Sequence, residues 1–350
     1  MNLILKEACI RKSEAAAPLT TVYIGGGTPS LLPPFLLAEM IQGIREVYSL
    51  DAVQEFTIEA NPGTVTKEWI DTALSLGINR LSLGMQAYQD RLLCLLGRIH
   101  RFEDVMASVT AARSAGFGNI GIDLIFGIPT QTIEDWSQTV ESVISLRPEH
   151  ISAYGLIPED GTPLYRDLEN GLLALPDPDD EREMYDLVIR KTAAAGYGQY
   201  EISNFSLDSY ECRHNIGYWT QIPYIGLGVS AASMTGVRCF TEGMEYKRSV
   251  NPDTITEYEK MINEGMKSPS ETISPADARF ETMMLGLRMN CGVNETCFRK
   301  MHHVSIESCY GKKLKEMESR GLVLRENGSW KLTHRGFDIQ NSILVELMDD

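Results

Sequence analysis

The strongest local indication of the fold is Thr21-Val22-Tyr23-Ile24-Gly25-Gly26-Gly27-Thr28-Pro29. It joins a short β-rich run to a glycine loop, whose three glycines let the backbone pass close to a ligand. In α/β folds, ligands bind at the carboxyl ends of the strands, which is where this loop lies. No Gly-Lys-Ser/Thr or Gly-x-Gly-x-x-Gly sequence follows, which argues against a nucleotide phosphate loop or a dinucleotide motif. Taken alone, the loop is equally compatible with a tight structural turn.

Four further β-rich runs follow at intervals of about 30 residues, the length of one βα unit. They are Phe56–Glu59, Arg80–Leu83, Ile120–Phe126 and Ile151–Leu156. Helical patterns lie between the runs at residues 34–48, 67–76, 102–115 and 133–146. Apolar strands alternating with helices are typical of a parallel sheet covered by helices, so we predict five consecutive parallel strands. A helical pattern at residues 3–11 precedes the first run, and the chain is therefore expected to begin inside a βα unit.

The remainder of the chain has a different pattern. An acidic turn at residues 176–180 begins a helix that runs through Ala195. Near the C-terminus, a helical stretch is followed by two short β-rich runs joined by Asn327-Gly328, a hairpin turn signature. We predict an α/β segment at residues 1–165, an α+β region at 166–270 and a helical, winged-helix-like unit at 271–350.

Composition excludes several classes of protein. The 350 residues carry a formal charge of −16, which opposes binding to nucleic acid, and Asn294–Asp350 has nine basic and nine acidic residues. No run of about 18 apolar residues and no signal peptide is present, so we expect a cytoplasmic protein without a transmembrane segment. The seven cysteines are scattered and odd in number, which favours reduced thiols.

Three polar residues stand at the ends of successive predicted strands: Glu59, Gln86 and Asp123. Taken singly, each of them could equally well be a structural residue whose hydrogen bonds are made within the protein. Together with the glycine loop they form a set of carboxylates and an amide, which suits a zwitterionic nucleoside better than a phosphate.

A second motif is Cys212-Arg213-His214-Asn215-Ile216-Gly217-Tyr218-Trp219. A histidine beside aromatic residues can ligate heme iron while the rings pack on the porphyrin, although by itself such a histidine is more often a core residue. His302 and His303 are expected to be a solvent-exposed pair, because neighbours on a helix point in different directions.

In order and spacing, these motifs resemble the oxygen-independent coproporphyrinogen III oxidases and the HemW-type heme chaperones of the radical S-adenosylmethionine (SAM) superfamily. The resemblance implies a partial (β/α)6 radical SAM barrel and, in its full-length form, SAM with a [4Fe–4S] cluster. It also implies a SAM site, with Ile157 near the adenine, formed by Gly26, Gly27, Thr28, Glu59, Gln86, Arg98, Asp123 and Ile157.

The pattern His-Asn-x-x-Tyr-Trp is similar to that of the heme chaperone branch. It implies that His214 interacts with heme, as a possible iron ligand, and that Tyr218 and Trp219 pack beside it. The implied function is heme binding and delivery to recipient proteins, with peripheral membrane association possible. The alternative is the oxidase, which decarboxylates a porphyrinogen with a 5′-deoxyadenosyl radical. No catalytic residue is assigned.

The sequence departs from this family in one respect. The Cys-x3-Cys-x2-Cys loop that holds the cluster is missing, so this chain has no cluster ligands, and the predicted barrel lacks its first strand. Three interpretations explain the missing loop. The start of the chain was assigned at an internal methionine, the protein naturally lost the cluster, or the chain is a non-catalytic remnant that retains the fold. We favour the first, because loss of the first strand exposes a sheet edge and opens the barrel.

Overall fold

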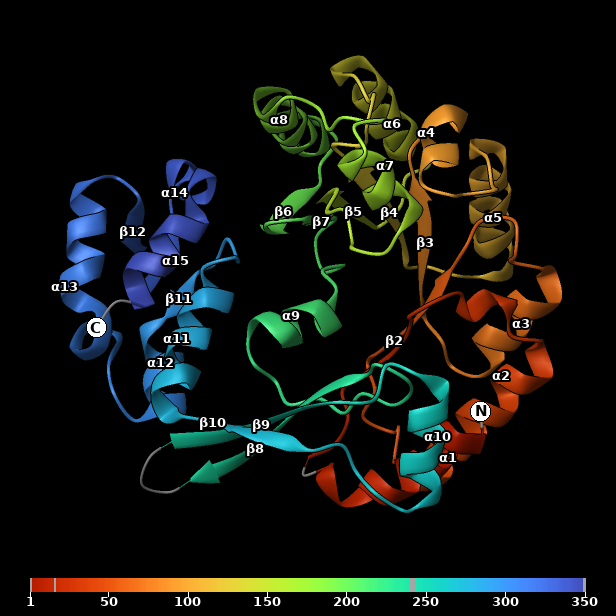
Figure 1. The fold of residues 1–350 in the computed structure, drawn as a ribbon, viewed down its shortest axis with the longest axis horizontal. Coiled ribbons are helices and arrows are strands. Elements are labelled where there is room, and N and C mark those ends of the chain that lie inside the picture. The colour runs from red at the N-terminus through yellow and green to blue at the C-terminus, as the bar shows by residue number, and fades with distance from the viewer. Residues whose placement is uncertain (1, 16, 240–242, 349–350) are drawn as a thin grey trace.

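A curved seven-stranded sheet forms the largest part of the structure (Figure 1). The computed structural model describes residues 2–15, 17–239 and 243–348. The strand order is β1-β2-β3-β4-β5-β7-β6. The strands are β1 (Thr21–Ile24), β2 (Glu55–Ala60), β3 (Arg80–Gln86), β4 (Ile120–Phe126), β5 (His150–Gly155), β6 (Gly198–Glu201) and β7 (Asn204–Ser206). Strands β1 to β5 are parallel, which confirms the predicted run of five, and β7 adds to β5 in antiparallel orientation.

Helices cover the convex face of this sheet (Figure 1). They are α1 (Asn2–Arg11), α2 (Pro34–Val47), α3 (Lys67–Ser75), α5 (Phe102–Ala115), α6 (Ile133–Ser145) and α8 (Pro178–Ala194). Two short helices, α4 (Asp90–Leu95) and α7 (Pro163–Glu169), follow β3 and β5 in the chain. The four helices expected between the strands end within one residue of their predicted bounds, because local signals set those ends. Thr132 and Asp135 form a capping box at the start of α6, and Gly116 ends α5 with a left-handed φ of 112°.

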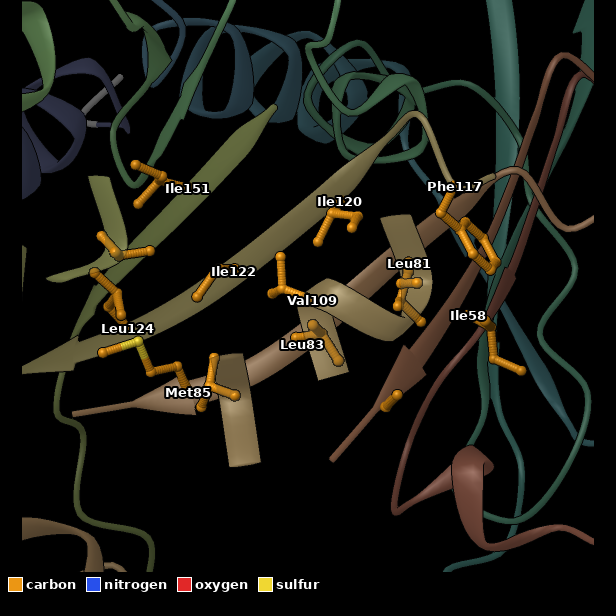
Figure 2. Packing of buried hydrophobic residues seen from close by; sticks show 14 of the residues in the cluster. Ile58, Leu81, Leu83, Met85, Val109, Phe117, Ile120, Ile122, Leu124 and Ile151 are labelled. Carbon is orange, nitrogen blue, oxygen red and sulfur yellow. The ribbon is translucent and has the colours of Figure 1, made fainter. Parts of the chain in front are cut away.

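The main hydrophobic core lies between the sheet and these helices. Leu81 and Leu83 of β3 lie in it together with Val109 of α5 (Figure 2). The intervening strand residues point to the opposite, concave face. That face is polar, since it carries Arg80, Ser82, Gln86, Asp123 and Ser152. The strands therefore alternate between apolar and polar residues, rather than being apolar on both faces, because the concave face borders a cavity.

The middle of the chain forms a second, three-stranded antiparallel sheet of order β10-β9-β8. Its elements are α9 (Arg213–Trp219), β8 (Ala232–Cys239), β9 (Gly243–Val250), α10 (Ile255–Asn263) and β10 (Ser270–Ile273). Helix α9 leaves the main sheet after β7 and lies beside the edge strand β1, with which it is in contact. This placement brings the second sequence motif next to the glycine loop.

Helix α1 contacts this middle region through a buried carboxylate. Glu7 is 1% exposed and accepts hydrogen bonds from the Tyr258 hydroxyl at 2.6 Å, the Asn251 side-chain amide at 2.7 Å and the Gly228 N–H at 2.8 Å. Arg11 lies 3.5 Å from the same carboxylate and donates to the Gly226 carbonyl at 2.9 Å. Segments more than 200 residues apart in the sequence are thereby joined.

The C-terminal part has its own hydrophobic core, which includes Phe298, Leu314 and Trp330. Its elements are α11 (Pro275–Gly286), β11 (Val293–Asn294), α12 (Glu295–His302), α13 (Ile306–Ser319), β12 (Val323–Glu326), β13 (Ser329–Leu332), α14 (His334–Asp338) and α15 (Gln340–Met348). Strands β12 and β13 form the predicted hairpin, with Asn327 and Gly328 both at positive φ. The segment boundaries at residues 165 and 270 stay predictions. Among the described residues, no helix is both long enough and apolar enough to cross a membrane.

The expectation for His302 was wrong. His303 is exposed, but His302 is only 4% exposed, packs on the Phe298 ring at 4.6 Å and shares a 2.7 Å hydrogen bond with the Thr282 hydroxyl. Helices α11 and α13 and strands β9 and β11 pack against α12, which the sequence of that helix does not reveal. Burial lowers the pKa of His302 from 6.5 to about 4.

We expect this histidine to make folding stability depend on pH. Between pH 6.5 and about 4, the unfolded chain binds a proton that folded His302 does not, so the free energy of unfolding falls as the pH is lowered through this range, by up to about 3 kcal/mol. His302→Gln should flatten this slope in urea unfolding measured at several pH values. His303→Asn, which suits the left-handed backbone there, should keep it. Parallel slopes for both variants and the wild type would contradict the prediction.

Candidate functional site

A cavity of about 390 Å³ opens on the concave face, at the carboxyl ends of β1 to β5. This is the end of a parallel sheet where α/β proteins bind their ligands, and the volume is within the usual range for a small-molecule site. Seven of the eight residues predicted for the SAM site line it, and they are Gly27, Thr28, Glu59, Gln86, Arg98, Asp123 and Ile157. The eighth, Gly26, contacts Glu59.

The glycine loop positions the carboxylate of Glu59. Gly26 and Gly27 have φ values of 77° and 94°, and the Gly26 N–H donates to Glu59 Oε2 at 3.1 Å. The Tyr23 hydroxyl donates to Oε1 at 2.7 Å. A Cβ atom at Gly25 would lie 2.7 Å from the Glu59 carboxylate and from the Tyr23 ring, so a larger residue there would displace these side chains. Both oxygens of this carboxylate are thus held in place at the cavity wall.

Arg98 and Thr28 are joined through a residue that was not assigned to the site. Arg98 Nη1 donates to Asn61 Oδ1 at 3.2 Å, and Asn61 Nδ2 donates to Thr28 Oγ1 at 3.1 Å. All three residues line the cavity. Asn61 therefore fixes the guanidinium of Arg98 relative to the glycine loop.

Gln86 enters the cavity from an unusual backbone conformation. It ends β3 with a φ of 65°, next to an irregularity in the pairing with β4 between Gly84 and Gln86. A Cβ atom at Gly84 would lie 2.8 Å from Gln86 Nε2, so the glycine leaves room for this amide. Left-handed backbone at a non-glycine residue is uncommon and is concentrated at ligand sites.

Asp123 occupies the middle of the concave face. Burial raises the pKa of its carboxyl group, and the Ser152 and Ser82 hydroxyls and the positive charge of Arg80 partly offset this rise. The Ser82 hydroxyl donates to Oδ2 at 3.1 Å. Ile157, in contrast, is 82% exposed and lies at the rim of the cavity, where it presents an apolar surface to a ligand.

Helix α9 begins against a carboxylate from the main sheet. Glu55, at the start of β2, accepts from the backbone N–H of Arg213 at 2.9 Å and of His214 at 3.0 Å. A carboxylate at a helix N-terminus satisfies unpaired N–H groups and complements the helix dipole. Asn215, the next residue of the motif, lines the cavity. The second motif is therefore part of the same site region as the glycine loop.

Three side chains surround the ring of His214. Nδ1 lies 2.9 Å from the Thr21 hydroxyl, and Nε2 lies 2.9 Å from the Tyr218 hydroxyl. The ring stacks on Tyr23, with 5.0 Å between centroids and 21° between the planes. Burial lowers the pKa of the His214 imidazole, so the ring is neutral at neutral pH.

The third residue of the predicted heme set lies elsewhere. Trp219 faces the C-terminal part, where the Arg288 guanidinium lies 5.6 Å from the centre of its ring. The structure thus brings His214 and Tyr218 together and does not bring Trp219 to them. Five residues along a helix correspond to a rotation of roughly 140°, which places Trp219 on another face of α9 than His214.

Several cavity residues were not predicted. They are Tyr23, Asn61, Arg80, Ser82, Ser152, Tyr154 and Asn215. Most of those on the strands could have been predicted from the alternation of side chains between the two faces of a strand, which repeats every two residues. Arg80, Ser82 and Gln86 are an even number of residues apart on β3, and they share the face of the sheet that the predicted Gln86 marks.

Two family models match the chain. The model of the radical SAM superfamily matches residues 2–143, and that of the HemN C-terminal domain matches residues 273–339. The chain is 36% identical over 333 residues to the heme chaperone HemW of Lactococcus lactis, which covers 95% of this chain and 86% of that protein. It is 35% identical to the heme chaperone HemW of Bacillus subtilis over 93% of this chain and 84% of that protein.

The chain belongs to the HemW heme chaperone family. The resemblance inferred from the motifs is thereby confirmed. The fold agrees with coproporphyrinogen III oxidase (HemN) of Escherichia coli at a TM-score of 0.82 and 20% identity, over 99% of this chain and 82% of that chain. The partial radical SAM barrel predicted from the sequence is thus also confirmed.

Membership of the radical SAM superfamily implies SAM and a [4Fe–4S] cluster. The cavity suits the first, since Glu59, Gln86 and Asp123 offer oxygen and amide partners for a zwitterionic nucleoside. The residues present do not fit the second. The chain has no Cys-x3-Cys-x2-Cys triplet, and among the residues that the structure describes no group of three or more His, Cys, Asp or Glu side chains could hold a metal ion.

Proposed function

We propose that this chain binds heme at α9 and delivers it to recipient proteins, with SAM bound in the neighbouring cavity. The observation that carries the proposal is the position of His214, a neutral imidazole beside the SAM cavity in a chain of the HemW family. Imidazole is a common axial ligand of heme iron. The proposal places SAM against Glu59, Gln86 and Asp123 and the transfer of heme to recipient proteins in the cytoplasm.

Heme titration tests the role of His214. The variant His214→Ala is expected to bind heme at least about tenfold more weakly and to shift the Soret band, since an axial ligand is lost. His334→Ala, at an exposed histidine of α14, should behave as the wild type. Equal affinity and an unchanged spectrum for His214→Ala would remove that residue from the function.

The alternative is oxidative decarboxylation of a porphyrinogen, which the fold shared with HemN favours. An anaerobic assay with coproporphyrinogen and SAM, on a form of the protein to which a Cys-x3-Cys-x2-Cys loop has been restored, separates the two functions. Formation of the decarboxylated porphyrinogen by the restored protein would favour the oxidase over the chaperone.

A further inference from the structure

The two nitrogens of His214 face very different surroundings. Nδ1 points to Thr21 on β1, in a partly buried contact, whereas Nε2 points to Tyr218, which is 39% exposed. Nε2 is therefore the nitrogen on the more exposed side of the ring. Tyr218 is the side chain that contacts this nitrogen, and its ring also packs on the Tyr224 ring, at 4.7 Å between centroids.

The hydrogen bonds select one tautomer of the ring. A neutral imidazole has one N–H and one lone pair, so of the two hydroxyls that face it one donates and the other accepts. The phenol of Tyr218 is more acidic than the alcohol of Thr21 and is the better donor. Tyr218 then donates to Nε2, and the N–H on Nδ1 donates to Thr21 Oγ1. This tautomer carries its lone pair on Nε2, where iron would bind.

We propose that Thr21 and Tyr218 preset His214 for iron ligation through Nε2. Thr21 holds the Nδ1–H and fixes the orientation of the ring, and Tyr218 caps Nε2 until heme iron replaces its hydroxyl. The ring stacked below, Tyr23, keeps the imidazole plane in place. This inference rests on the proposed function and assigns Thr21 as a positioning residue for the iron ligand. Hydrogen bonds to the second nitrogen of a ligating histidine are known to set its tautomer and basicity.

The test compares heme binding by the full chain carrying single substitutions. Thr21→Val keeps the shape and removes the acceptor, so heme should bind about tenfold more weakly. The bound heme should also have a more positive Fe(III)/Fe(II) midpoint potential, because the imidazole donates less charge. Thr21→Ser restores a hydroxyl and should return both values toward those of the wild type. Thr20→Val, at the exposed neighbouring threonine, is the matched control and should change neither.

Tyr218→Phe tests the cap. It removes the hydroxyl that competes with iron and keeps the ring, so heme should bind about fivefold more tightly. The inference is overturned if Thr21→Val leaves the heme affinity and the midpoint potential unchanged, or if Tyr218→Phe binds heme more weakly. In either case, a loss of heme binding in His214→Ala would still support the proposed function. Wild-type behaviour of His214→Ala would overturn both.

Discussion

The variant Glu59→Leu is expected to bind SAM about 100-fold more weakly than the wild type. The Glu59 carboxylate is held at the cavity wall by the Tyr23 hydroxyl and the Gly26 N–H, so its orientation is set before a ligand arrives. Loss of the charged hydrogen bonds between this carboxylate and the ligand amounts to about 3 kcal/mol, which is about 100-fold in affinity. Isothermal titration calorimetry with SAM measures the effect.

Two further variants sharpen this experiment. Glu59→Gln keeps the shape and one acceptor oxygen, and should fall between Glu59→Leu and the wild type. Glu68→Leu changes an exposed carboxylate on α3 and should leave SAM affinity unchanged. If Glu59→Leu bound SAM with the wild-type affinity, the cavity would not be the SAM site that the motifs imply.

Replacement of Glu7 by leucine is expected to lower the free energy of unfolding by about 3–5 kcal/mol, the range for breaking a buried ion pair from one side. Three donors, from Tyr258, Asn251 and Gly228, lose their common acceptor in this variant. The Arg11 guanidinium, which is 5% exposed, loses one of its two neighbouring carboxylates. Urea unfolding followed by circular dichroism gives the change.

The matched control is Lys6→Leu, one residue earlier on the same helix. Lys6 is exposed, and its hydrogen bond to Asn263 is at the surface, so a change within about 0.5 kcal/mol is expected. A similar small change for Glu7→Leu would mean that α1 does not hold the middle region through this carboxylate.

The site itself was predictable where a motif is continuous in sequence. Six residues that the structure places around one cavity stand within short motifs, and they are Gly27, Thr28, Glu59, Gln86, Arg98 and Asp123. Asn215 was missed, because its approach to the cavity depends on Glu55 holding the start of α9 against β2. Arg80 was not predicted, because an apolar run predicts a strand that is buried on both faces. A polar strand residue such as Arg80 is accommodated only where one face of the sheet lines a cavity.

By itself, the sequence determined the five parallel strands, the four helices between them and the hairpin at Asn327-Gly328, since glycines, caps and residue periodicity act over a few neighbouring residues. Only the tertiary structure decided that Glu7 meets Tyr258, that His302 is buried and that Trp219 turns away from His214. Each of these depends on which surfaces meet after segments far apart in the chain pack together. The free energies of burying these side chains and of pairing their polar groups arise only when the segments pack, so no local sequence pattern encodes them.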